Sequence, residues 1–263
     1  MTEYEHLKRT DEGEVTTIKL NRPDTRNALN AALIRELTEC FEEIAADARV
    51  RAVVLTGEGR VFCAGADIGY MSASAGFSYD ENLEDAGRMA TIFRVVDECP
   101  KPVVAAVRGA AVGGGAGLVA VADVVVAEAG ARFAFSEVLL GIAPATIAPF
   151  VVRKIGYSHA RALFLSGERF DAAKACGIGL VHEIASPQEL DAAVDKKVEE
   201  LLCGGPVAQA AIKESLRRIE TVEPLDALAM MSGVISNLRT SDEGQEGLNA
   251  FLEKREPRWR KPG

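Results

Sequence analysis

The chain has 263 residues, of which 48% are hydrophobic and 26% charged, and its formal net charge is −9. This composition is typical of a globular protein, and the acidic balance argues against general nucleic-acid binding, which depends on Lys and Arg neutralising phosphates. Five scattered cysteines without C-x-x-C spacing, a charged N-terminal stretch and the lack of a membrane-length apolar run predict a cytoplasmic protein without a metal site, disulfide framework or membrane partner.

Strand and helix patterns alternate through the first half of the chain. Residues 14–20 alternate in hydropathy like a strand and run into a turn signal, Asn-Arg-Pro-Asp. Apolar residues three and four apart predict an amphipathic helix over 30–50. Short apolar runs predict buried strands at 51–57 and 101–109, with a glycine-bearing loop at 57–71 and a helix at 83–97 between them.

The second half of the chain becomes increasingly helical. A helix near 118–122 and strands near 123–127 and 132–135 come first. From about 145 onward the patterns are mostly helical, apart from a strand within 179–184, and they are clearest over 187–203, 206–220, 224–239 and 243–255. Buried strands that alternate with helices predict an α/β core with a largely parallel sheet. We expect this core over 1–203 and a C-terminal helical region over 204–263.

A glycine-rich stretch stands at one strand-to-helix turn. Residues 112–118 read Val-Gly-Gly-Gly-Ala-Gly-Leu between two apolar segments, a context that excludes a flexible linker. The stretch does not match the G-x-G-x-x-G dinucleotide fingerprint. Two interpretations remain open, which are close helix packing and exposure of helix N-terminal amides to an oxygen that gains negative charge during a reaction.

A second small-residue loop favours the ligand-binding interpretation. The sequence Phe-Cys-Ala-Gly-Ala-Asp-Ile at 62–68 also follows a predicted buried strand. Loops that follow neighbouring parallel strands meet at the same edge of a sheet. Backbone amides from both loops are therefore expected to converge.

Taken together and in order, these segments resemble the crotonase (enoyl-CoA hydratase/isomerase) family. The resemblance implies a crotonase-like spiral of ββα units followed by helices for oligomerisation, as a homotrimer or dimer of trimers. It also implies an acyl-CoA thioester substrate and no separate cofactor, since coenzyme A is part of the substrate. The matching segments are 20–30, 53–68, 101–118, 122–145, 163–184 and 240–259.

The resemblance also assigns individual residues. The amides of Ala66 and Gly114 would hold the thioester oxygen. The coenzyme A moiety would lie along the two loops, and Arg26 is either a phosphate contact or a solvated surface residue. A lysine that the family often carries after Ile68 is replaced by Gly69. The remaining residues implied for substrate or coenzyme A binding are Ala28, Ala64, Asp67 and Ile68, with Phe251 or Lys254 reaching an adenine pocket that can belong to a neighbouring subunit.

The chain departs from the typical hydratase at one of two glutamates. Glu137 matches one acid/base residue, although a helix-capping or surface role is the alternative from the residue alone. The other position is Gly117, and we expect space for a substrate group or a water molecule beside it. The resemblance therefore implies an enoyl-CoA hydratase, with branched or carboxylated acyl-CoA esters such as methylglutaconyl-CoA among its expected substrates. The alternatives are a Δ3,Δ2-enoyl-CoA isomerase that uses one glutamate and a non-catalytic acyl-CoA-binding protein.

Overall fold

A computed structural model describes residues 4–219 and 221–260. Its main sheet has six strands in the order β1-β2-β3-β4-β6-β9. Strand β1 is antiparallel to β2, whereas the other neighbouring strands in this sheet are parallel. The strands are β1 (Leu7–Glu12), β2 (Val15–Leu20), β3 (Ala52–Gly57), β4 (Val103–Val107), β6 (Val124–Glu128) and β9 (Glu183–Ala185).

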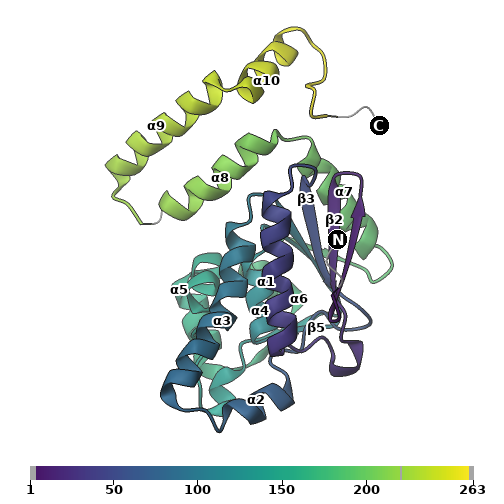
Figure 1. Ribbon diagram of the computed structural model, residues 1–263, viewed down its shortest axis with the longest axis vertical. Helices are drawn as coiled ribbons and strands as arrows, with labels where there is room; N and C mark the ends of the chain where they lie inside the picture. Colours follow the sequence, from purple (N-terminus) through teal and green to yellow (C-terminus); the bar gives the residue numbers. More distant parts are fainter. Residues whose placement is uncertain (1–3, 220, 261–263) are drawn as a thin grey trace.

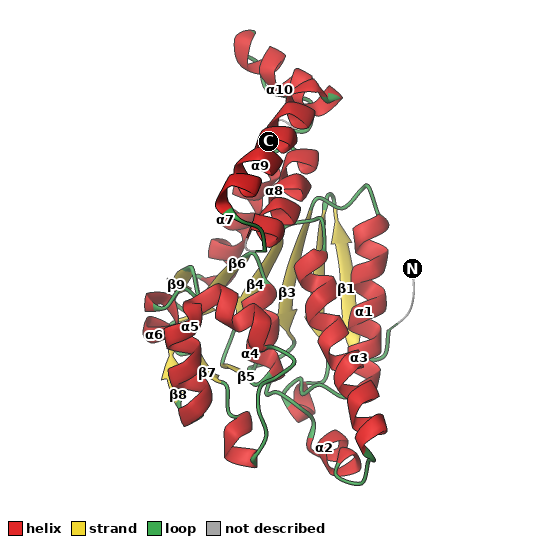
Figure 2. Ribbon diagram, turned by 90° about the vertical axis from the view of Figure 1, so that its left-hand side faces the viewer, coloured by secondary structure: helices red, strands yellow, loops and turns green. Residues whose placement is uncertain are grey.

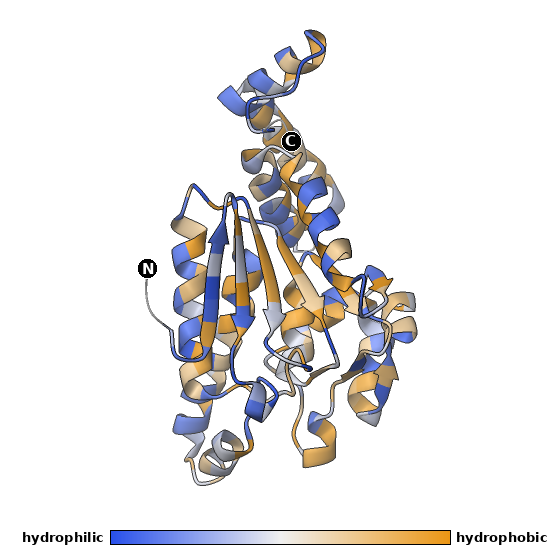
Figure 3. Cartoon of the chain, turned by 90° about the vertical axis from the view of Figure 1, so that its right-hand side faces the viewer, coloured by the Kyte–Doolittle hydropathy of each residue, from blue (hydrophilic) through white to orange (hydrophobic). Residues whose placement is uncertain are grey.

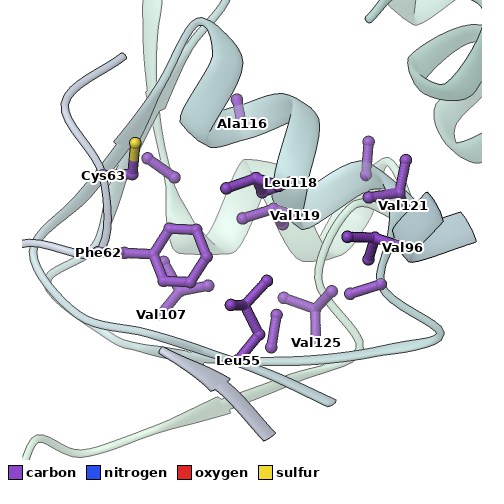
Figure 4. Packing of buried hydrophobic residues seen from close by; sticks show 14 of the residues in the cluster. Leu55, Phe62, Cys63, Val96, Val107, Ala116, Leu118, Val119, Val121 and Val125 are labelled. Atoms are coloured by element: carbon purple, nitrogen blue, oxygen red, sulfur yellow. The ribbon is translucent and has the colours of Figure 1, made fainter. Parts of the chain in front are cut away.

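Helices cover both faces of this sheet, which explains the uninterrupted apolar runs in β3 and β4. On one face lie α1 (Ala31–Ala46), α3 (Tyr79–Glu98) and α4 (Gly114–Val121), and on the other lies α7 (Leu190–Leu202). Because side chains alternate along a strand, Val53 and Leu55 join the first core and Ala52 and Val54 the second. Figure 4 shows the first core, where Leu55, Val107 and Val125 pack beneath α4.

A short second sheet extends the core. It contains β5 (Ala110–Val112), β7 (Arg132–Ala134) and β8 (Arg169–Asp171), with β5 parallel and β8 antiparallel to β7. Helices α5 (Ala148–Ser166) and α6 (Ala172–Gly177) lie beside it (Figure 2). The predicted α/β class, with its largely parallel sheet and helical C-terminal region, is confirmed.

Strand β1 and helix α2 (Ile68–Ser74) were not expected from the sequence. Strand β1 is strongly hydrophilic, with Leu7 its one buried residue, because its outer edge is not covered by another strand (Figure 3). Helix α2 lies within the predicted loop and its continuation. It is organised by an N-cap rather than by apolar spacing, since the Asp67 carboxylate accepts hydrogen bonds from the amides of Gly69 and Tyr70 at 2.9 and 3.2 Å.

The C-terminal helices lie beyond one end of the sheet. Helices α8 (Pro206–Ile219), α9 (Pro224–Thr240) and α10 (Asp242–Leu252) pack on one another there, at the end of the molecule opposite α2 (Figures 1 and 2). Large apolar side chains are exposed on them, including Leu225, Leu228 and Phe251. Within the described ranges, no helix combines the length and apolar character needed to cross a bilayer.

Candidate active site

The two glycine-bearing loops run side by side and touch. Cys63 and Ala111 form a parallel bridge, in which the Cys63 amide donates to the Ala110 carbonyl and the Val112 amide donates to the Cys63 carbonyl, both at 3.0 Å. Further along, a β-carbon on Gly65 would lie 3.0 Å from the Val112 carbonyl oxygen. Glycine is therefore required by close packing, and the same packing brings Ala66 and Gly114 to one place.

The amides of Ala66 and Gly114 are free to bind an oxygen atom. Leu29 and Ala66 form a parallel bridge that does not use the Ala66 amide. The Leu29 amide donates to the Gly65 carbonyl, and the Asp67 amide donates to the Leu29 carbonyl. Gly114 is the first residue of α4, so its amide has no intrahelical acceptor. Among the described residues, neither amide donates to another protein group. Both residues line a pocket of about 390 Å³.

Glu137 lies in the same pocket. It begins a 3-10 turn, Glu137–Leu140, that follows the buried Phe135. One carboxylate oxygen, Oε2, is buried and has no hydrogen-bond partner within the protein. Burial raises the pKa of the Glu137 carboxyl, and its own backbone amide opposes this only in part. A carboxylate with a raised pKa and an unused oxygen suits proton transfer near neutral pH.

The surroundings of Gly117 differ from the free space that we expected there. A β-carbon there would lie 2.3 Å from Cγ2 of Ile147 and 2.8 Å from Cε1 of Phe93. Both of these side chains are buried, and Gly117 does not line the pocket. The predicted free space beside Gly117 is wrong, because core side chains fill it. No substrate group or water molecule can take the place of a second glutamate at this point.

The residues expected along coenzyme A have different environments. Ala64 lines the pocket. Ala28 is buried and Ile68 is 81% exposed. Arg26 is exposed in a left-handed conformation, and its carbonyl accepts the Ala64 amide at 3.0 Å. The Asp67 side chain caps α2 and is paired with Arg22, so within this chain it has a structural role.

Arg22 and Asn27 were missed at the sequence level. The Arg22 guanidinium lies 3.0 Å from the Asp67 carboxylate and donates to the Ala28 carbonyl at 2.5 Å. The buried Asn27 amide donates to the carbonyls of Glu58 and Val61. These bonds tie residues 22–29 to the loop that carries Ala66. Nothing in the sequence pattern identifies these two residues. Their contacts either join segments about 30 or more residues apart or lie within a local turn of irregular shape.

Phe251 and Lys254 do not reach the pocket of their own chain. Phe251 is 82% exposed on α10, and α10 lies at the end of the molecule opposite α2 (Figures 1 and 2). Neither residue lines the pocket. An own-chain role at this site is therefore excluded by their position, and a role toward a neighbouring subunit stays a prediction.

The far wall of the pocket contains an acidic residue that was also missed. Asp85 on α3 accepts the Tyr70 hydroxyl at 2.5 and 2.6 Å through its two carboxylate oxygens. Tyr70 itself also lines the pocket. Asp85 gave no signal because charged residues on an amphipathic helix are usually solvated.

Known proteins resemble this chain along nearly its whole length. The family described as "Enoyl-CoA hydratase/isomerase" matches residues 10–262. A "Putative enoyl-CoA hydratase" of Thermus thermophilus is 34% identical over 253 residues, which are 96% of this chain and 100% of that protein. The "2,3-dehydroadipyl-CoA hydratase" of Escherichia coli is 35% identical, covering 92% of this chain and 94% of the relative.

Solved structures agree with these sequence matches. The crystal structure of an enoyl-CoA hydratase from Shewanella pealeana superimposes with a TM-score of 0.93 at 38% identity, covering 97% of this chain and 96% of that chain. The paired loops, the two free amides and the family match along the chain lead to one conclusion. The chain belongs to the enoyl-CoA hydratase/isomerase family, also called the crotonase family.

Proposed function

We propose that this protein is an enoyl-CoA hydratase that adds water reversibly across the α,β double bond of an acyl-CoA thioester. One observation carries the proposal: Ala66 and Gly114, whose amides have no acceptor among the described residues, line the same pocket as Glu137. Its relatives from Thermus thermophilus and Escherichia coli are both named as hydratases.

The proposed chemistry uses the two amides to stabilise an enolate. When the thioester oxygen accepts both N–H groups, electron density moves toward it and Cβ becomes electrophilic. Glu137 takes a proton from water as the oxygen bonds to Cβ, and the π electrons of the double bond move onto the thioester oxygen. Glu137 then returns the proton to Cα, and the enolate collapses to the thioester. One water molecule is added, and the enzyme is unchanged.

A single glutamate is sufficient for this cycle because the proton that it accepts is the proton that it returns. The filled space beside Gly117 supports a one-carboxylate mechanism over one in which a bound water replaces a second acid. A lone carboxylate also suits a Δ3,Δ2-enoyl-CoA isomerase, in which the proton moves between two carbons. We propose hydration rather than isomerisation because the relatives are named as hydratases.

Product analysis separates these reactions. We would incubate the protein with crotonyl-CoA, a methyl-branched 2-enoyl-CoA and a 3-enoyl-CoA in H₂¹⁸O, and identify the products by mass spectrometry. Incorporation of ¹⁸O at Cβ, lost in Glu137→Gln, is the expected result. Migration of the double bond without ¹⁸O would identify an isomerase. Tight binding of CoA esters without any product would identify a non-catalytic member.

We further propose that coenzyme A lies along residues 26–28 and 64–68, with Arg26 near its phosphates, and that the protein forms a homotrimer or dimer of trimers. The exposed apolar side chains of α8, α9 and α10 support an association of this kind. In such an assembly Phe251 or Lys254 would approach a neighbour's adenine pocket. Analytical ultracentrifugation tests the assembly, and coenzyme A affinity of Phe251→Ala and Lys254→Ala tests the residues.

A further inference from the structure

The wall of the pocket formed by α2 and α3 presents hydrogen-bond acceptors. Tyr70, Met71 and Ser74 of α2 and Asn82, Asp85, Ala86 and Met89 of α3 line it. Of the residues expected along coenzyme A, Ala64 and Ala66 line the pocket, whereas Arg26, Ala28, Asp67 and Ile68 lie outside the lining. If the thioester oxygen is held at Ala66 and Gly114, this wall faces the acyl chain.

The polar hydrogens of this wall are already used within the protein. The Tyr70 hydroxyl donates to Asp85. The Asn82 side-chain amide donates to the carbonyls of Phe77 and Ser78, both at 3.1 Å. The Ser74 hydroxyl donates to the Met71 carbonyl at 2.9 Å. What these groups can offer to an acyl chain is therefore oxygen lone pairs.

The charged side chains that line the pocket are negative, so they add to the partial negative charge of these oxygen acceptors. Its lining, drawn from the described residues, includes the carboxylates of Asp85 and Glu137 and no Lys, Arg or His. Arg88 donates to Asp85 at 3.1 Å, but its side chain is 52% exposed and it lines a different cavity. An acyl chain that ended in a carboxylate would meet a negative charge on this wall, where the side-chain hydrogens of Tyr70, Ser74 and Asn82 are already bonded within the protein.

We propose that Asp85 determines acyl specificity by excluding chains that end in a carboxylate and accepting neutral chains of the same shape. This inference rests on the proposed function, since it assumes that the acyl group enters this pocket. It narrows the substrate class to neutral acyl-CoA esters, including branched ones, and opposes a carboxylated substrate such as methylglutaconyl-CoA.

The test compares acids with amides of the same size. We would measure kcat/KM for 2,3-dehydroadipyl-CoA and for its ω-amide, and for glutaconyl-CoA and its ω-amide, so that chain length does not decide the result. Wild type is expected to favour each amide by at least about tenfold, equivalent to about 1.4 kcal/mol. The acid is an informative probe because the relative from Escherichia coli is named for it.

Two variants assign the preference to one charge. Asp85→Asn keeps an acceptor for the Tyr70 hydroxyl and removes the charge, and it is expected to reduce the preference to within about threefold. Asp80→Asn makes the same change on the exposed first turn of α3 and is expected to keep the wild-type ratio. Equal rates for acid and amide in wild type, or an unchanged ratio in Asp85→Asn, would overturn the proposal.

A binding measurement separates this inference from the proposed function. Saturated adipyl-CoA and its ω-amide cannot be hydrated, so their dissociation constants, measured by calorimetry, report the wall alone. The same tenfold preference and its loss in Asp85→Asn are expected. If wild type failed to hydrate crotonyl-CoA, the proposed function would fail, while the calorimetric ratio would still decide the role of Asp85.

Discussion

The Oε1 atom of Glu137 lies 2.9 Å from the position that a β-carbon on Gly113 would occupy. Gly113 has φ +52° and its amide donates to the Ala134 carbonyl at 2.9 Å. The glycine thus serves two purposes, since it permits a backbone that other residues rarely adopt and leaves room for the carboxylate. Gly113, which precedes the proposed oxyanion amide of Gly114, therefore leaves the space that the Glu137 carboxylate occupies.

Gly113→Ala is therefore expected to displace Glu137. A side-chain shift of about 1 Å can reduce activity by about a hundredfold, and we expect a loss of this order in kcat with crotonyl-CoA. Gly13→Ala is the matched control, because Gly13 also has a positive φ of +62° but no atom lies within 4 Å of the new β-carbon. Similar losses of activity in both variants would contradict this explanation.

The rate of hydration is expected to depend on the ionisation of Glu137. As the base for water, this residue must begin ionised, and burial raises its pKa above the ordinary value of a glutamate. The value of kcat/KM should therefore fall as the pH is lowered, and the fall should begin at a higher pH than an exposed glutamate would give. Glu137→Gln is expected to reduce kcat by roughly a hundredfold to ten-thousandfold and to remove this acid limb. An unchanged pH profile in the residual activity would assign the limb to another group.

Ionisation of Glu137 is expected to lower the stability of the fold, although the same ionisation is needed for activity. Because the folded-state pKa is raised, ionised Glu137 opposes folding at a pH above that value, and this penalty disappears below the unfolded-state pKa. We expect Glu137→Gln to melt at a higher temperature than wild type near pH 8, with the difference shrinking toward pH 4. Glu42→Gln, on an exposed position of α1, is the control for loss of one charge. A difference in melting temperature that grew toward low pH would refute the sign.

Gly117→Ala is expected to destabilise the fold without direct contact with the pocket. The new β-carbon would overlap Ile147 and Phe93, and overpacking of this kind costs about 1–3 kcal/mol. Gly130→Ala is the control, because the nearest atom to its β-carbon would be 3.8 Å away. Denaturant unfolding measures both variants. Gly117→Glu is not expected to create a second acid, since Ile147 and Phe93 occupy the space that the new side chain would need.

Arg22→Met is expected to loosen the loop that carries Ala66. It removes the ion pair with Asp67 and the hydrogen bond to Ala28, both partly buried, and the loss of each such contact typically costs about 1–3 kcal/mol. We expect lower stability and an increase in KM for crotonyl-CoA. Arg49→Met removes an ion pair with Asp47 in which the arginine is 86% exposed and is expected to change neither quantity measurably. Equal effects of the two substitutions would argue against a role for Arg22 in the site.

Much of the fold of this protein, and the main residues of its candidate site, are determined by local sequence. Apolar runs such as those of β3 and β4 specify strands that are buried on both faces, because successive side chains point to opposite sides. The glycines at 65 and 113–115 predict turns where backbones approach closely, and the family resemblance on these segments was confirmed. Sequence motifs alone indicate Glu137, Ala66 and Gly114 as site residues, and the fold brings them to one pocket.

Only the tertiary structure decided what surrounds these residues. Strand β1 forms because β2 offers an edge, although its own sequence is hydrophilic. The contact of Ile147 with Gly117, the clamp of Arg22 on Asp67 and the acceptor wall around Asp85 each join segments 15 or more residues apart. A local pattern records which residues one element buries, but the partner against which it buries them is fixed only when the whole chain packs.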